Sequence, residues 1–143
     1  MNSEAMEVAL LGNVACDFEQ YLTKLVSVPV KFTGLPNGTP EDEREAVLGR
    51  AAVMIGGWPG GRREAPAMRL VQHVGAGVEG FLIPDLPRTA YLCNAYGHES
   101  SVAEAVWLMS LSLTRNFLPL DARLRRGRWA GVVPHGDLIG LTM

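Results

Sequence analysis

The 143-residue sequence lacks most signatures that would assign a reaction directly. It has two cysteines, Cys16 and Cys93, which lie far apart and form no CxxC pair. This usage favours reduced thiols in a cytosolic protein over a disulfide or a metal site. GxSxG, HExxH and Walker motifs are absent as well. The residues by themselves therefore assign no catalytic residue and no metal ligand.

Strong net charge and long apolar runs are also missing. The formal net charge is −2, so no nucleic-acid partner is expected. The longest apolar-rich run, Val102–Leu113, contains Glu104 and two serines and is too short to cross a bilayer. The start, Met1–Glu7, lacks the basic residues of a secretory signal. We therefore expect a soluble, cytoplasmic, globular protein of one domain with a short extension, with no membrane partner.

What the sequence does contain is an alternation of strand-like and helix-like segments. Apolar, β-branched runs predict five strands: Val8–Leu11, Val28–Phe32, Ala51–Ile55, Arg69–Val74 and Thr89–Cys93. Helical spacing of apolar residues predicts a helix over Asp17–Val26. A second helix should run to Leu48, with Thr39 as N-cap and Pro40 at its first position. This order predicts an α/β fold with a parallel sheet and helices on both faces.

The last third of the chain predicts a long helix and a tail. Ser100 or Ser101 is expected to cap a helix that reaches Phe117, with a bend or break near Pro119. Helix should continue to Arg126, where Gly127 ends it. Residues 128–140 are expected to be extended or loop. The arginines at 123, 125, 126 and 128 are interpreted as a solvated helix end.

Three loops follow predicted strands, at the sheet edge where ligands of such folds bind: Gly56–Gly61, Gly75–Gly80 and Asn94–Glu99. In the second, glycines let the backbone N–H groups of Gly75, Ala76 and Gly77 face a ligand, which suits a carboxylate. The alternative is a purely structural strand-to-helix turn. Gly75, Gly77 and Gly80 have the GxGxxG spacing, but no acidic residue follows at the end of a second strand, so the loop is not interpreted as a dinucleotide fingerprint.

Isolated aromatic and histidine residues provide weaker candidates. Trp58, in the glycine-rich loop, could wall a pocket or lie partly buried at the surface. His98, before the long helix, could bind a ligand or transfer a proton, or have no such role. His73 is expected to be buried in a strand and hydrogen-bonded. His135 has no sequence context that indicates function.

Taken together, Val71–Gly131 resembles the D-isomer-specific 2-hydroxyacid dehydrogenases. In that family a strand leads to a GAGVD-like turn, then to an N-x-P/Y-G loop, a VAE-containing helix and an arginine-rich segment ending in G-R-W. The corresponding stretches here are VGAGVE, NAYG, VAEA and RRGRW, in the same order. The first 65 residues fit by element order. Ala105 departs from the histidine that frequently follows the Ala-Glu pair.

The resemblance implies a flavodoxin-like substrate-binding domain over residues 1–99. Residues 100–143 would form a long interdomain-type helix and a linker toward a nucleotide-binding domain that is absent. The amides at Ala76 and Gly77 would hold the substrate carboxylate, with Gly75 and Trp58 beside them. His98 would lie at a loop position that lines the cleft and is often Asn in the family.

The resemblance also implies an activity. The chain would be the substrate-binding portion of an NAD(P)-dependent oxidoreductase that acts on small D-2-hydroxy acids. The catalytic arginine, glutamate and histidine would lie beyond Met143, so none is assigned here, and His135 is not that histidine. NAD or NADP would serve the full-length enzyme, and neither is expected to bind this chain alone. The chain would be inactive alone and a homodimer through the Ser101–Phe117 helix.

Two other readings remain open. One is a stand-alone module that binds or senses a small carboxylate through Ala76 and Gly77. The other, a response-regulator-like fold, requires acidic residues at the end of the first strand. Leu10–Val14 has none, so this reading ranks last.

Overall fold

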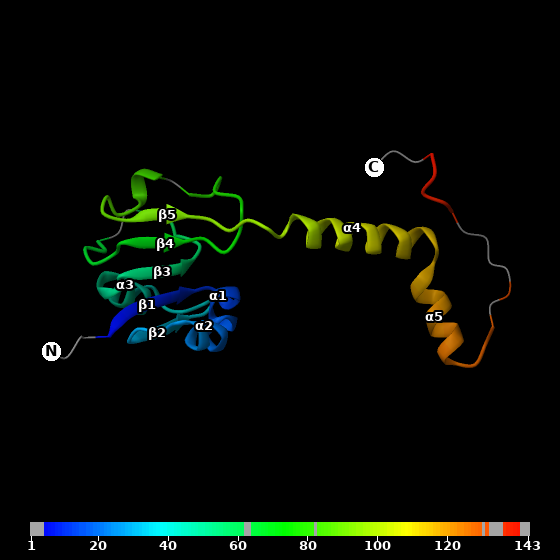
Figure 1. Ribbon diagram of the computed structural model, residues 1–143, viewed down its shortest axis with the longest axis horizontal. Coiled ribbons are helices and arrows are strands. Elements are labelled where there is room, and N and C mark those ends of the chain that lie inside the picture. Colours follow the sequence, from blue (N-terminus) through cyan, green and yellow to red (C-terminus); the bar gives the residue numbers. More distant parts are fainter. Residues whose placement is uncertain (1–4, 62–63, 82, 130, 132–135, 141–143) are drawn as a thin grey trace. The chain divides into compact units, whose positions relative to one another are not determined.

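The computed structural model describes residues 5–61, 64–81, 83–129, 131 and 136–140. The chain divides into two compact units, residues 1–96 and residues 97–143. Each unit is described by itself below (Figure 1). The expected loop over residues 128–140 falls partly outside the described residues, and His135 lies wholly outside them.

The first unit contains one sheet of five parallel strands, in the order β2-β1-β3-β4-β5 (Figure 1). This is the strand order of flavodoxin-like folds, so the predicted fold class is confirmed. The strands are β1 (Met6–Leu11), β2 (Val30–Leu35), β3 (Val53–Gly56), β4 (Leu70–Gln72) and β5 (Tyr91–Cys93). From β1 the chain goes first to β2 on one side and then to β3 on the other side, so the topological switch point lies between β1 and β3.

Two helical layers cover the sheet. On one face, α1 (Asn13–Asp17) and α2 (Glu19–Leu25) pack through Ala15 and Leu22 against alternate residues of the strands. On the other face, α3 (Glu41–Arg50) packs through Val47 and Leu48. Alternation along each strand decides which side chains meet which helix, because successive residues point to opposite faces.

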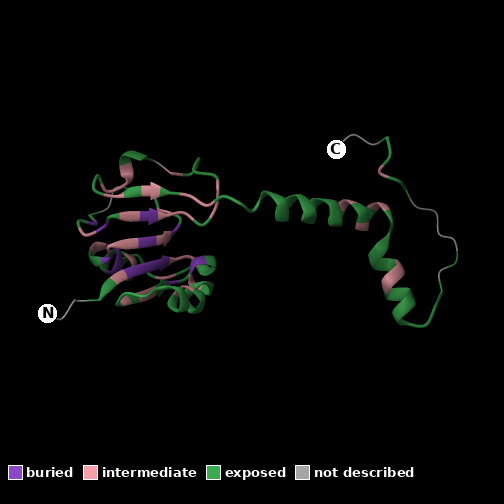
Figure 2. Ribbon diagram, viewed as in Figure 1, coloured by how far each residue is buried: buried purple, intermediate pink, exposed green. Residues whose placement is uncertain are grey.

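The larger core lies on the α3 face. Met54 and Val71 are fully buried there, and the pairing register places both in line with Ala9. On the α1 face, Val8 and Leu10 fill a smaller core. The register carries that second face on to Tyr91 and Cys93 of β5, which are exposed (Figure 2). The α1 face is therefore well covered over β1 but open over β5.

Two expected helix starts were wrong. Thr39 does not cap α3: its hydroxyl donates to the Pro36 carbonyl at 2.7 Å, and Pro40 takes the N-cap position. Neither Ser100 nor Ser101 caps the long helix, because His98 is the N-cap and its carbonyl accepts the first helical hydrogen bond. Neither helix has a side-chain cap hydrogen bond at its start.

Helix boundaries also shifted. The segment predicted as one helix over Asp17–Val26 is split, because α1 ends at Asp17 and α2 begins at Glu19. The long helix, α4 (Glu99–Thr114), stops three residues before the expected end. Asn116 has a left-handed backbone with φ 51°, and α5 (Phe117–Arg125) starts directly after it. The break therefore lies at Asn116, while Pro119 occupies the first turn of α5, where proline is tolerated.

The second unit consists of α4 and α5 and has no buried residue in either helix (Figure 2). Gly127 ends α5 with φ 70°, as expected, and its amide donates to the Leu124 carbonyl. None of the helices in the part of the chain that the structure describes has the length and apolar character of a membrane span.

Candidate functional site

The carboxyl ends of β3 and β4 bring two of the predicted loops to the same edge of the sheet. Gly56 ends β3 with φ 139°, and a Cβ at this position would lie 2.2 Å from the Leu11 carbonyl oxygen. Only glycine fits so close to the neighbouring strand. The chain turns away from the sheet at this point, and the loop that carries Trp58 follows.

The turn at Gly75–Gly77 is held in place by its carbonyl groups. The Gly75 carbonyl accepts the Ala95 amide at 3.0 Å, and the Ala76 carbonyl accepts the Asn94 side-chain amide at 2.7 Å. Both donors follow β5. The turn is thus fixed against the next strand along the sheet by bonds that leave its own N–H groups unused.

The amides of the turn have no protein acceptor in the described part of the chain: the N–H groups of Gly75, Ala76 and Gly77 form no hydrogen bond there. Successive unused N–H groups on a fixed turn form a partial positive charge that suits an anion. A carboxylate can accept several such bonds at once. This arrangement is what the sequence-based hypothesis of a carboxylate site requires.

The turn needs glycines for the space they leave and not for a left-handed backbone. Neither glycine has a positive φ. A Cβ on Gly75 would lie 3.1 Å from Nε2 of His73, and one on Gly77 would lie 2.5 Å from Oε2 of Glu79. The turn therefore has two ionisable side chains folded against it, which the sequence did not indicate.

Trp58 packs against the larger core and is half-buried. Its indole N–H donates to the Gly61 carbonyl of its own loop at 3.2 Å. The residue thus braces the loop after β3, and its ring lies among the apolar side chains around the α3-face core. Both alternatives from the sequence, a pocket wall and a partly buried surface residue, are compatible with this position.

His98 is exposed at the N-cap of α4 and belongs to the second unit. The turn belongs to the first unit. His98 therefore stays a predicted site residue, and the arrangement within the first unit does not depend on it.

A pocket of about 330 Å³ lies at the same edge of the sheet, beyond β1, β2 and β3. Its polar lining includes Asn37 and Arg44, and Gly57 and Pro59 of the Trp58 loop form one side. Arg44 is already paired with Glu41. This pocket is the nearest alternative to the Gly75–Gly77 turn as a ligand site, because it lies at the topological switch point.

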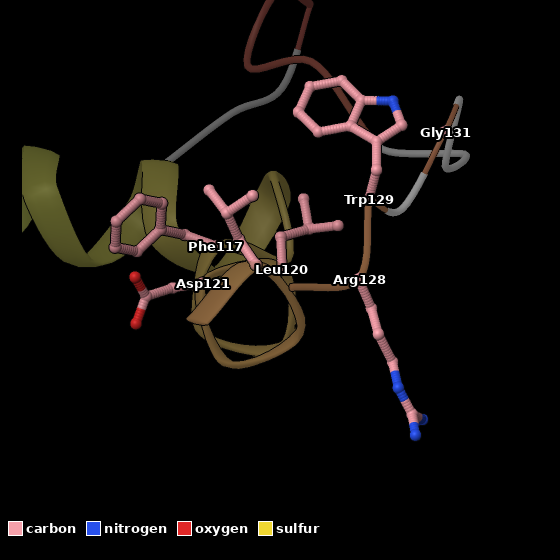
Figure 3. Close-up of a pocket in the computed structure, with 7 residues that line it drawn as sticks. Phe117, Leu120, Asp121, Arg128, Trp129 and Gly131 are labelled. Atoms are coloured by element: carbon pink, nitrogen blue, oxygen red, sulfur yellow. The ribbon is translucent and has the colours of Figure 1, made fainter. Parts of the chain in front are cut away.

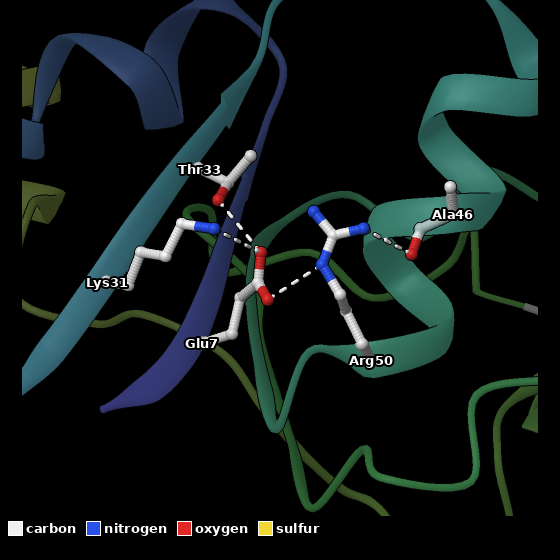
Figure 4. Close-up of polar contacts among 5 residues, drawn as sticks. All are labelled: Glu7, Lys31, Thr33, Ala46 and Arg50. Atoms are coloured by element: carbon white, nitrogen blue, oxygen red, sulfur yellow. Dashed lines mark hydrogen bonds and ion pairs between the residues drawn. The ribbon is translucent and has the colours of Figure 1, made fainter. Parts of the chain in front are cut away.

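A charged cluster with a structural role lies near the amino ends of β1 and β2, away from the loops described above. Glu7 accepts hydrogen bonds from Arg50 at 2.8 Å and from Thr33 at 3.0 Å, and its carboxylate lies 3.7 Å from Nζ of Lys31 (Figure 4). The Arg50 hydrogen bond is the main reason that the pKa of Glu7 lies below its usual value, although burial opposes it. The cluster ties β1 to β2 and to the end of α3.

The second unit has a separate apolar pocket of about 240 Å³ on α5. Figure 3 shows Phe117 and Leu120 on the helix, with the Trp129 ring above them and the Arg128 side chain pointing away. Nothing in its lining matches the predicted site. Within the described residues, no three His, Cys, Asp or Glu side chains are grouped as metal ligands would be.

Neither a protein-family model nor a curated protein matches the chain. Solved structures do match. A D-isomer specific 2-hydroxyacid dehydrogenase family protein from Aeromonas salmonicida subsp. salmonicida A449 aligns with a TM-score of 0.62 at 20% identity, over 94% of this chain and 44% of that chain. Phosphoglycerate dehydrogenase from Lactobacillus plantarum aligns with a TM-score of 0.41 at 18% identity, over 95% of this chain and 44% of that chain. The chain thus shares its fold with part of a protein of the family that its sequence resembles and spans less than half of that protein's length.

Proposed function

We propose that this chain is the substrate-binding portion of an NAD(P)-dependent oxidoreductase that acts on small D-2-hydroxy acids and their 2-oxo counterparts. One observation carries the proposal: the amides of the Gly75–Gly77 turn have no acceptor among the described residues, while the turn's carbonyls are tied to Asn94 and Ala95. The backbone donors of such a turn are already fixed, and preorganised donors bind anions best.

In our proposal the cofactor is bound elsewhere. The GAGVEG stretch over Gly75–Gly80 has the GxGxxG spacing, but it opens no helix, because the next α-helix among the described residues is α4. It therefore lacks the helix N-terminus against which the pyrophosphate of a dinucleotide is held. In our proposal NAD or NADP is bound outside these 143 residues, and so are the groups that exchange the proton. This chain's share of the reaction is to bind the acid by its carboxylate and to present the 2-position. By itself it should not oxidise NADH.

Substrate binding can be tested by thermal unfolding. Adding pyruvate or glycolate at about a hundred times its dissociation constant should raise the melting temperature, since ligand that binds only the native state stabilises it by about 2.7 kcal/mol. Hydroxyacetone, which lacks the carboxylate, should not. Gly77→Val should remove the response, because a side chain at this position meets Glu79. Gly80→Val is the matched control, since a Cβ there meets nothing within 4 Å. An equal response in both variants would refute the site.

A stand-alone carboxylate sensor is the second candidate. It is favoured by the fact that the turn, its carbonyl partners and Trp58 all lie within the first unit. The two candidates differ in what a nucleotide-binding partner would add. NADH consumption with glyoxylate, restored by such a partner and blocked by Gly77→Val, supports the enzyme. Carboxylate binding that no partner converts into turnover supports the sensor.

We further propose that α4 pairs with α4 of a second copy. Large apolar side chains lie exposed along most of its length: Val102, Val106, Trp107, Leu108, Met109, Leu111 and Leu113. The second unit has a further apolar pocket on α5 (Figure 3). An apolar surface of this kind promotes association. Both cysteines are unpaired, which suits the reducing cytoplasm that we propose as its location.

A further inference from the structure

The sequence suggested no role for His73 beyond that of a buried strand residue, but the structure places its ring beside Gly75 of the turn that we propose as the carboxylate site. It follows β4 directly, and its amide donates to the Cys93 carbonyl at 2.7 Å. The side chain is half-buried and packs edge-on against Phe81, with ring centroids 4.9 Å apart and an angle of 72° between the planes. The ring is therefore held from two sides.

The two ring nitrogens face different groups. Nδ1 lies 3.3 Å from the carbonyl oxygen of Gly56, the last residue of β3. A carbonyl can only accept, so this bond requires the proton on Nδ1. Nε2 is the atom nearest to the position that a Cβ on Gly75 would take, at 3.1 Å. Nε2 has no hydrogen-bond partner among the described residues.

Because Nδ1 is bonded to the Gly56 carbonyl, whether Nε2 donates or accepts a hydrogen bond depends on pH. In the neutral ring the proton is on Nδ1, and Nε2 presents a lone pair to the turn, which disfavours a carboxylate there. When the ring takes up a second proton, Nε2 becomes a charged donor beside Gly75 of the turn. Charged donors form the stronger hydrogen bonds to carboxylates. Imidazole is the side chain whose ordinary titration falls between about pH 5 and pH 8.

We propose that His73 is a binding residue for the ligand carboxylate, and that its imidazolium form completes the donor set of the Gly75–Gly77 turn. The proposal rests on the proposed carboxylate site and adds a side-chain donor to its backbone amides. It predicts that small 2-oxo and 2-hydroxy acids bind more tightly as the pH falls from about 8 to about 6, where they remain ionised.

The groups around the ring allow this assignment to be isolated. Glu79 approaches the turn at Gly77 and is the carboxylate closest to the site on its own segment. On the neighbouring strand β5, Cys93 pairs with Gln72 and so faces the other side of the sheet from the His73 ring. From β3 the Gly56 carbonyl contacts the ring, and Phe81 is apolar. Glu79→Gln and Cys93→Ser should therefore keep the pH response if His73 is its source.

The test is a titration of the full chain, labelled with ¹⁵N, with sodium pyruvate at about pH 6 and at about pH 8. We expect the Ala76 and Gly77 amide signals to shift, with an affinity about fivefold higher at the lower pH. His73→Phe keeps a ring against Phe81 and should bind equally weakly at both pH values. His73→Gln supplies a neutral donor and should also lose the pH dependence. Ring ¹⁵N shifts of the unmodified chain should show the Nδ1–H tautomer at about pH 8, which needs no variant.

The outcomes separate this inference from the function on which it rests. If pyruvate shifts Ala76 and Gly77 equally at both pH values, or if the pH response survives in His73→Phe, the role of His73 is refuted and the carboxylate site stands. If pyruvate shifts neither amide at any pH, the carboxylate site itself is refuted. A neutral ring with its proton on Nε2 would also overturn the role of His73.

Discussion

The two units of this chain are both rich in apolar residues, but only the first buries them. Residues such as Leu10, Leu35 and Met54 are completely inaccessible in the first unit, whereas neither helix of the second unit has a buried residue (Figure 2). The sheet supplies two faces against which helices pack, while α4 and α5 have few partners within their own unit. Apolar composition therefore makes a core only where a second layer covers it.

This difference separates the roles of the two units. The first unit can hold a turn in a fixed geometry, because strands on both sides of it are paired and its core is closed. The second unit presents an exposed apolar surface, which promotes association. In our proposal, binding belongs to the first unit and association to the second.

The largest contrast should come from a matched pair of methionine truncations. Met54 in β3 is fully buried, and Met109 in α4 is 57% exposed. Met54→Ala should reduce the free energy of unfolding by about 2–5 kcal/mol through the cavity it leaves. Met109→Ala should change it by less than about 0.5 kcal/mol in dilute, monomeric protein. Urea unfolding followed by circular dichroism measures both, and equal losses would show that the second unit has a core of its own.

The next largest effect is expected on self-association, when a charge replaces an apolar side chain of α4. Leu108 is 66% exposed on α4, and Leu108→Glu should weaken self-association at least about tenfold, since a charge would be buried at the interface. Gln20→Glu is the control, because it adds the same charge to an exposed position of α2 in the first unit. Light scattering after size-exclusion chromatography gives the mass. A monomer at every concentration in the unmodified chain would argue against the α4 interface.

The smallest effect separates the ion pairs of the two units. Arg50 bonds the mostly buried Glu7, whereas Arg125 bonds Asp121 on the open surface of α5. Arg50→Met should destabilise the first unit by less than about 1 kcal/mol at neutral pH, and Arg125→Met should have no measurable effect. Because both arginines are substantially exposed, screening keeps both effects small.

The pH dependence of the Arg50 effect has a definite sign. The pKa of Glu7 in the folded state lies below its ordinary value, chiefly because of the hydrogen bond from Arg50. Its contribution to stability is therefore complete above the unfolded value and is lost as the pH falls through the folded one. Unfolding curves of the unmodified chain and Arg50→Met should differ at neutral pH and converge in acid. A difference that persists in acid would mean that Arg50 stabilises the fold by packing, through its bond to Ala46, rather than by charge.

The sheet could be predicted from the sequence because its strands are short, apolar and β-branched between turn residues, as in Val53–Gly56. Helix ends were less predictable. Thr39 and Ser101 are residue types that often cap helices. Here Pro40 and His98 occupy the N-cap positions, and neither helix start has a side-chain cap. Asn116 broke the long helix before Pro119 could, because asparagine tolerates a left-handed backbone.

The site was predictable only in part. Glycine spacing after a strand indicated the Gly75–Gly77 turn, since that pattern is local. The partners of the turn were not indicated, because the bonds from Asn94 and Ala95 cross between strands. His73 was assigned to the strand interior. Its role depends on Gly56, seventeen residues earlier, and no local pattern reports that contact.

The central claim is that the amides of the Gly75–Gly77 turn bind a small carboxylate, and a crystal structure of the chain with pyruvate tests it most directly. We predict a carboxylate within hydrogen-bond distance of the Ala76 and Gly77 amides. Pyruvate bound instead in the pocket of Asn37 and Arg44, with the turn empty, would contradict the claim.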